Sequence, residues 1–257
     1  MNVMAKAQAK LPSGANLMLL GEYGSTAHGV SLDNSDHDYL GVAVEPRTAI
    51  HGLDNYEHTI LKDGAAGEAT GAGETEGTVY GLQKFCRLAE QGNTAIMSLL
   101  YLPSYTVKNR FGELLLRNRE LFRSREVLQR FAGHLTSEAN RITGDKAQKV
   151  NRPELVAKYG YDTKAAYQAV KLAFHGRRFA REGELRIPFS PEEREYILSI
   201  RRGELTPEEI LGFLREATSF LDNEAETSNL LPALAPREKI NSLLEEIYLG
   251  SYGLSPI

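Results

Sequence analysis

The chain has 257 residues, of which 42% are hydrophobic and 25% are charged, a composition ordinary for a folded protein of one large domain or two modest ones. Its single cysteine, Cys86, excludes an internal disulfide framework and a zinc site built from several cysteines. No apolar run approaches the ~20 residues that a membrane span needs, and the N-terminal stretch lacks the apolar core of a signal peptide. We therefore expect a cytoplasmic protein without a membrane partner.

The net charge of −4 is unevenly distributed along the chain. Residues 108–202 contain 21 lysines and arginines against 12 aspartates and glutamates, a local charge of 21 − 12 = +9. A basic stretch of this kind attracts nucleic-acid phosphates. It also fits the solvated surface of a set of helices, and charge alone favours this second interpretation.

The first predicted elements form a strand, helix, strand unit. "NLMLLGEYGS" is an apolar run that ends in Gly, and "HDYLGVAV" is a second short run of β-type character. Between them, residues 24–34 begin with the small and polar residues of a turn that enters a short helix, followed by a loop rich in Asp, Asn and Ser. Residues 64–77 are so rich in Gly, Ala and acidic residues that we expect a mobile loop, and "ETEGTVY" predicts a third strand.

The apolar spacing becomes helical from about residue 80 onward. Leu82, Phe85, Leu88 and Ala89 fall at i, i+3, i+6 and i+7, the periodicity of one helix face. Five further segments are predicted helices: 111–122, 124–144, 162–183, 190–203 and 206–226.

Two of these helices have clear start signals. Ser190 and Thr206 are each followed by Pro and then by two glutamates, which places an N-cap, a proline at the first helical position and acidic residues in the first turn. The change from strands to helices predicts two domains, with a boundary between residues 105 and 120. We set the domains at 1–110 and 111–257.

The stretch "DHDYLG" contains the acidic pair with the clearest chemical meaning. On a strand, Asp36 and Asp38 point to the same face while His37 points to the other. Two neighbouring carboxylates repel each other unless a cation lies between them, and hard oxygen ligands at this spacing suit Mg²⁺. A solvated acidic loop is the main alternative, since a D-x-D pair alone is a weak signal. A calcium loop is disfavoured because Leu40 breaks its pattern.

Gly24 and Ser25, upstream of this pair, have the features of a phosphate cradle. Glycine lets a backbone approach a phosphate closely, the following helix N-terminus offers N–H donors, and Ser25 adds a hydroxyl. His28 lies in the same segment, where it either contacts a triphosphate or caps and packs the short helix. A phosphate cradle followed by a carboxylate pair on the next strand has the parts for nucleotidyl transfer.

The stretch "GSTAHGVSLDNSDHD" resembles the GS…SDxD signature of the DNA polymerase β-like nucleotidyltransferase superfamily. "EGTVYGLQKFCRLAEQGNTAIMSLL" and "KYGYDTKAAYQAVKLAFHG" resemble its RlaP-type branch, predicted nucleotidyltransferases linked to RNA repair, and the likeness runs from about residue 17 to about residue 245. The resemblance implies an α+β fold, with a small mixed sheet flanked by helices over 1–110 and a helical substrate- or nucleotide-binding domain over 111–257. It also implies transfer of a nucleoside monophosphate from an NTP with Mg²⁺ or Mn²⁺.

The resemblance further implies a third carboxylate on a later strand, acting as metal ligand and general base. Glu76 holds that position, with glutamate in place of the more usual aspartate, so the expected catalytic and metal-binding set is Asp36, Asp38 and Glu76. Glu74, on the same strand face, is the reserve candidate. Ser98 is a second departure, because relatives tend to have Glu there.

Three cationic residues, Lys164, Lys171 and Arg178, recur at helical spacing in the basic middle of the chain. They are candidates for binding NTP phosphates or an acceptor backbone by Coulomb attraction. Lys164 matches a family motif and is the first choice, with Lys171 next. A solvated helical face is the alternative for Lys171 and Arg178.

These observations favour a metal-dependent nucleotidyltransferase with NTP as substrate and RNA as the favoured acceptor. A protein hydroxyl, as in antitoxin-like protein adenylyltransferases, and a small-molecule acceptor stay open. A non-catalytic nucleotide- or RNA-binding module is the alternative from another class. The Gly-Ser pair and the paired aspartates argue against that module, whereas the departures at Glu76 and Ser98 argue for it. The sequence indicates no oligomeric state.

Overall fold

The computed structural model describes residues 2–32, 35–63, 75–143 and 152–254. The chain divides into two compact units. The first combines Met1–Phe122 with Ala235–Ile257, and the second is Arg123–Leu234. The expectation of one boundary near residue 110 therefore differs from the observed division. Residues 111–122 and the C-terminal helix belong to the unit that contains the sheet.

The first unit contains a five-stranded mixed sheet within the described residues, in the order β3-β4-β2-β1-β5. Strands β2 and β4 are parallel, and the other neighbouring pairs are antiparallel. This arrangement, with helices around it and a helical second unit, confirms the α+β expectation. The strands are β1 (Asn16–Tyr23), β2 (His37–Val44), β3 (His58–Lys62), β4 (Thr75–Gly81) and β5 (Val107–Lys108).

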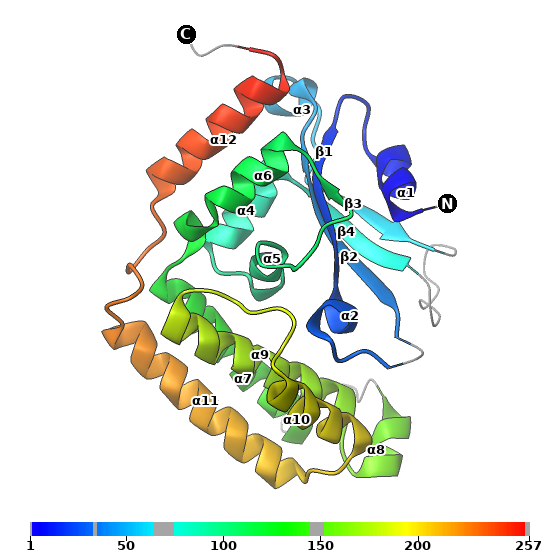
Figure 1. The fold of residues 1–257 in the computed structure, drawn as a ribbon, viewed down its shortest axis with the longest axis vertical. Coiled ribbons are helices and arrows are strands. Elements are labelled where there is room, and N and C mark those ends of the chain that lie inside the picture. The colour runs from blue at the N-terminus through cyan, green and yellow to red at the C-terminus, as the bar shows by residue number, and fades with distance from the viewer. Residues whose placement is uncertain (1, 33–34, 64–74, 144–151, 255–257) are drawn as a thin grey trace. The chain divides into compact units, whose positions relative to one another are not determined.

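The two faces of the sheet are covered by different helices (Figure 1). Helix α1 (Val3–Lys10) packs on one face, where its Ala7 joins a buried cluster with Leu17, Leu20, Ala43, Leu61 and Val79. The other face carries the helices α4 (Leu82–Glu90), α5 (Thr94–Leu99), α6 (Arg110–Arg117) and α12 (Arg237–Ser251). The described residues of this unit also form three short helices: α2 (Gly24–His28), α3 (Arg47–His51) and the 3₁₀ helix η1 (Arg119–Phe122).

Helix α12 joins the first unit although it follows the second unit in the chain. Its Ile240, Leu243 and Ile247 are buried. The Arg237 guanidinium makes two contacts with the Glu90 carboxylate, at 2.7 Å and 2.9 Å. Helical periodicity predicts the buried stripe of a helix but not the unit on which the stripe packs, which explains the difference from the expected boundary.

The second unit is helical over its described residues. Helix α9 (Thr163–Glu182) is central, because α7, α10 and α11 all pack against it extensively while α8 contacts it over a smaller area. Phe131, Phe179 and Leu221 are fully buried in the core of this unit. Both expected N-caps are confirmed as reciprocal capping boxes, Ser190 with Glu193 and Thr206 with Glu209. The helices are α7 (Arg125–Thr143), α8 (Pro153–Tyr159), α9 (Thr163–Glu182), α10 (Pro191–Arg202) and α11 (Pro207–Thr227). Within the described segments of the chain, no helix has the length and apolar character needed to cross a membrane.

Candidate active site

Asp38 and Glu76 lie opposite each other on neighbouring strands. In the parallel pair of β2 and β4, Asp38 is in register with Glu76. Residues opposite each other in a ladder project to the same face of the sheet, and neighbouring strands lie about 4.8 Å apart. The fold therefore brings together two carboxylates that are far apart in the sequence. Glu74, the reserve candidate, lies outside the described residues.

Asp36 has a less defined position than Asp38. Strand β2 begins at His37, so Asp36 precedes the strand and is absent from the described ladders with β1 and β4. In the part of the chain that the structure describes, no group of three or more His, Cys, Asp or Glu side chains is arranged to hold a metal ion. The structure thus pairs Asp38 with Glu76, and the role of Asp36 as a third ligand stays a prediction.

The donor set at this position fits a hard divalent cation. Mg²⁺ prefers oxygen ligands, and it is commonly held by one or two protein carboxylates while water and substrate phosphates complete its shell. Asp38 and Glu76 supply two carboxylates on one face of two adjacent strands. These two residues, with Asp36 close to Asp38 in the sequence, are the side chains that could hold Mg²⁺ or Mn²⁺.

Gly24 lies directly against the Asp38 carboxylate. It follows Tyr23, which pairs with Asp38 across β1 and β2, and its φ of 78° lies in the left-handed region that favours glycine. A Cβ at this position would lie 3.0 Å from the Asp38 Cβ and 3.1 Å from its Cγ, and nearer still to Oδ2. Glycine is therefore required both by the backbone conformation and by the space that the carboxylate occupies.

Ser25 and His28 both belong to α2, a helix of only five residues. Ser25 is half-buried, and its carbonyl accepts a hydrogen bond from the Val30 amide. His28 is fully buried, its Nδ1 contacts the Gly24 carbonyl oxygen, and its ring stands edge-on to Tyr23 at 6.0 Å. These contacts fit the interpretation that His28 packs the short helix. Phosphate binding by Ser25 and His28 stays a prediction.

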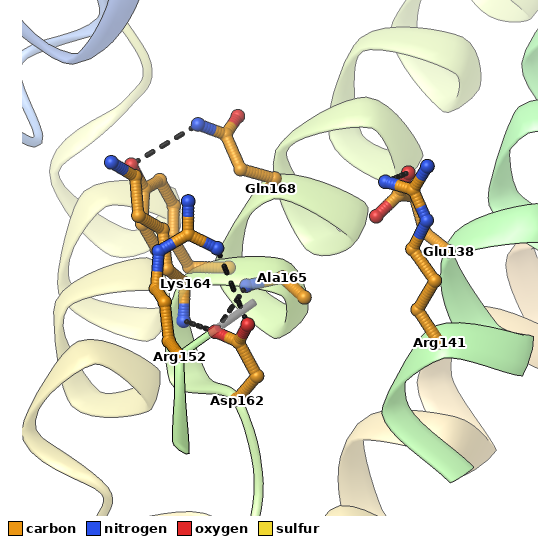
Figure 2. A network of polar contacts seen from close by, with 8 residues as sticks. Glu138, Arg141, Arg152, Asp162, Lys164, Ala165 and Gln168 are labelled. Carbon is orange, nitrogen blue, oxygen red and sulfur yellow. Dashed lines mark hydrogen bonds and ion pairs between the residues drawn. The ribbon is translucent and has the colours of Figure 1, made fainter. Parts of the chain in front are cut away.

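Lys164 and Lys171 lie on α9 in the second unit, whereas the glycine, serine and carboxylates lie in the first. Lys164 is exposed in the first turn of α9. Its backbone N–H and that of Ala165 donate to the Asp162 carboxylate at 2.9 Å and 3.0 Å, and Arg152 pairs with the same carboxylate (Figure 2). The N-terminus of α9 is thus capped by its own aspartate, and the exposed Lys164 side chain beside it carries a charge that attracts anions.

Lys171 is only 5% exposed, so it is not part of a solvated helical face. Its predicted contact with NTP phosphates stays a prediction, as does that of Lys164. Ser98, the other departure noted in the sequence, is also buried, and its hydroxyl donates to the Thr94 carbonyl within α5 at 3.0 Å. In this structure Ser98 therefore packs inside the first unit and bonds to its own helix.

Comparison with known proteins gives one match that covers most of the chain. A family model described as "RlaP: RNA repair pathway DNA polymerase beta family" matches residues 3–245. The match includes the Gly-Ser pair, both aspartates of the D-x-D motif, Glu76 and the two lysines of α9. None of the curated proteins compared with the chain matches it.

Proposed function

Because the chain belongs to the RlaP family of the DNA polymerase β superfamily, we propose that it is a metal-dependent nucleotidyltransferase. It transfers a nucleoside monophosphate from an NTP to an acceptor hydroxyl and releases pyrophosphate. The observation that carries this proposal is the cross-strand pair of Asp38 and Glu76, with the backbone of Gly24 against the Asp38 carboxylate.

Each of these residues has a task in the proposed reaction. Asp38 and Glu76, with Asp36, would hold the divalent cation, which when bound offsets negative charge on the triphosphate. Gly24 and Ser25 would orient the triphosphate, because a glycine backbone lets phosphate oxygens approach N–H groups. The acceptor hydroxyl attacks the α-phosphorus, a P–O bond forms, and the bond to the β-phosphate bridging oxygen breaks. Glu76 would receive the proton of the attacking hydroxyl.

RNA is the favoured acceptor. The family description refers to an RNA repair pathway. Residues 108–202 carry a charge of 21 − 12 = +9, which attracts a phosphate backbone. Most of this basic stretch belongs to the second unit, where the exposed Lys164 is the first candidate for phosphate contacts. Lys171, which is buried, would need a local rearrangement to reach a phosphate.

The test is transfer of label from each α-³²P-NTP, with Mg²⁺ or Mn²⁺, to separate pools of cellular RNA and protein, with EDTA as the blank. Metal-dependent label on RNA supports the proposal and identifies the nucleotide. Label on protein instead would replace RNA by a protein hydroxyl as acceptor. If no pool, and no panel of small hydroxyl compounds, takes label with any NTP and either metal, the proposed activity is refuted and a nucleotide-binding module becomes the better account.

Gly24→Ala is expected to lower the rate of transfer about tenfold. The new methyl group would push the Asp38 carboxylate away from its position, and the positive φ adds a backbone cost of about 1 kcal/mol. Gly14→Ala is the matched control: Gly14 has a φ of 82°, but its nearest neighbour for a Cβ is the Pro46 Cβ at 3.7 Å. Equal loss of activity in both variants would show that backbone strain, and not the carboxylate, sets the effect.

A further inference from the structure

Glu22 and His37 form a side-chain pair on the face of the sheet opposite the Asp38 carboxylate. The Glu22 Oε1 and His37 Nδ1 atoms are 2.7 Å apart, and the side chains are 31% and 48% exposed. Glu22 is on β1 and His37 is the first residue of β2. His37 is thus the residue between the two aspartates, and its side chain is fixed to the neighbouring strand.

The start of β2 has incomplete backbone support. On the β1 side the ladder ends with Tyr23 opposite Asp38, because the chain leaves the strand at Gly24. On the β4 side it begins one residue earlier, with His37 opposite Thr75. In the ladders of the described residues, His37 therefore has a strand partner on the β4 side only, and its side-chain contact with Glu22 attaches it to β1.

We propose that Glu22 and His37 are positioning residues for the carboxylates of the active site. Successive side chains of a strand alternate between faces, so fixing His37 on one face of β2 fixes the direction of Asp38 on the other. Asp36 directly precedes His37, so the same contact restrains the chain from which it projects. The role is indirect, since neither Glu22 nor His37 shares the face of the carboxylates. This inference rests on the proposed metal site, and it adds two residues that the motif does not include.

Charge and positioning make different predictions for His37, whereas both predict weaker cation binding when the Glu22 carboxylate is removed. If the pair acted only through its charges, removing the Glu22 carboxylate would weaken cation binding, whereas removing the imidazole would leave it unchanged or strengthen it. Positioning predicts a loss in both variants. Loss of a residue that orients metal ligands typically costs 10- to 100-fold in metal affinity, and we expect about tenfold here because the contact acts through the backbone.

The test uses the full chain and titrates Mn²⁺ while electron paramagnetic resonance measures the free ion. Binding that survives in Asp38→Asn is subtracted as unrelated to the site. Glu22→Ala and His37→Ala are each expected to weaken the remaining binding about tenfold, with no further loss in the double variant. Glu22→Gln, which retains an acceptor for a neutral imidazole, is expected to lose less than Glu22→Ala.

Glu57→Ala is the matched control. It breaks an exposed ion pair of similar length, Glu57 to Lys84 at 2.6 Å, near the opposite end of β4. Amide hydrogen exchange at residues 36–38 gives a readout that needs no metal, and it should accelerate in Glu22→Ala and His37→Ala but not in Glu57→Ala. Circular dichroism confirms that each variant is folded.

Several results would overturn the inference: stronger Mn²⁺ binding in His37→Ala, unchanged binding in both alanine variants, an equal loss in Glu57→Ala, or a wild type with no Asp38-dependent binding. Failure of the proposed function is distinguishable. If no acceptor is labelled but Mn²⁺ binding still depends on the pair, the activity is refuted and the positioning role stands. If labelling occurs and the pair has no effect on binding, only the positioning role is refuted.

Discussion

Asp38→Asn is expected to reduce nucleotidyl transfer at least about a hundredfold while the protein remains folded. Even residues that only orient a metal ligand typically cost 10- to 100-fold when they are replaced, so loss of a ligand should reach or exceed the upper end of that range. The amide has nearly the same shape as the carboxylate that Gly24 contacts, but it lacks the negative charge that faces Glu76 across the strands. Initial rates at saturating Mg²⁺ and NTP measure the effect.

Asp54→Asn provides the control for this experiment. Asp54 is exposed and lies in the same unit, in the loop before β3, so the substitution makes the same change of charge away from the site. Its transfer rate should equal that of the wild type. Activity of Asp38→Asn within a few-fold of the wild type would remove Asp38 from the proposed metal ligands, and with it the main support for the mechanism.

Glu45→Ala is expected to lower the free energy of unfolding of the first unit by about 3 kcal/mol. Glu45 follows β2 and is only 2% exposed. Its Oε1 accepts a hydrogen bond from the Gln83 backbone N–H at 2.9 Å, and its Oε2 accepts one from the Tyr248 hydroxyl at 2.8 Å. Removal of the carboxylate leaves two partly buried donors without this acceptor and opens the space against Gly81. Amide exchange in β1 and β2 reports the stability of this unit by itself.

The burial of the Glu45 carboxyl also predicts that the stability of the first unit depends on pH. Burial raises the pKa of the Glu45 carboxyl, although hydrogen bonds from Gln83 and Tyr248 partly oppose this shift. The folded chain therefore holds this proton more tightly than the unfolded chain does. The stability that this raised pKa adds to the folded state is fully present below the unfolded pKa of about 4.3, and it is lost as the pH rises through the folded pKa.

Glu45→Gln removes this titration while it keeps a hydrogen-bonding side chain of the same size. The difference in unfolding free energy between Glu45→Gln and the wild type should move in favour of the variant as the pH rises from 4 to 7. Tyr248→Phe is the comparison, since it removes one donor to Glu45 but retains the titrating carboxyl. A difference between Glu45→Gln and wild type that stays constant over this range would contradict the raised pKa.

Local patterns in the sequence predicted the elements that carry the motifs. The strands at 16–23, 37–44 and 75–81 and the capped helices after Ser190 and Thr206 are confirmed because alternation, apolar spacing and capping act over a few neighbouring residues. Strand β3 was not predicted. It has five residues, of which only Leu61 is buried, so its alternation is too short and too polar to stand out.

The site was predictable only in part, for the same reason. Spacing places Asp36 and Asp38 on one face of an extended chain, but the register of Asp38 with Glu76 depends on a parallel pairing between strands separated by a helix and another strand. Nothing in the local sequence pointed to Glu22, whose partner His37 is 15 residues away. The burial of Lys171 likewise results from how the helices of its unit pack.

The return of α12 to the first unit affects the order in which the chain becomes able to fold during synthesis. The second unit is an insertion: Phe122 precedes it, and Ala235 resumes the first unit after it. The contact of Arg237 with Glu90 spans 147 residues, and that of Tyr248 with Glu45 spans 203. A ribosome therefore releases every residue of the helical insertion before it completes the sheet unit. During synthesis, the second unit therefore has all of its residues available for folding while the first unit still lacks α12.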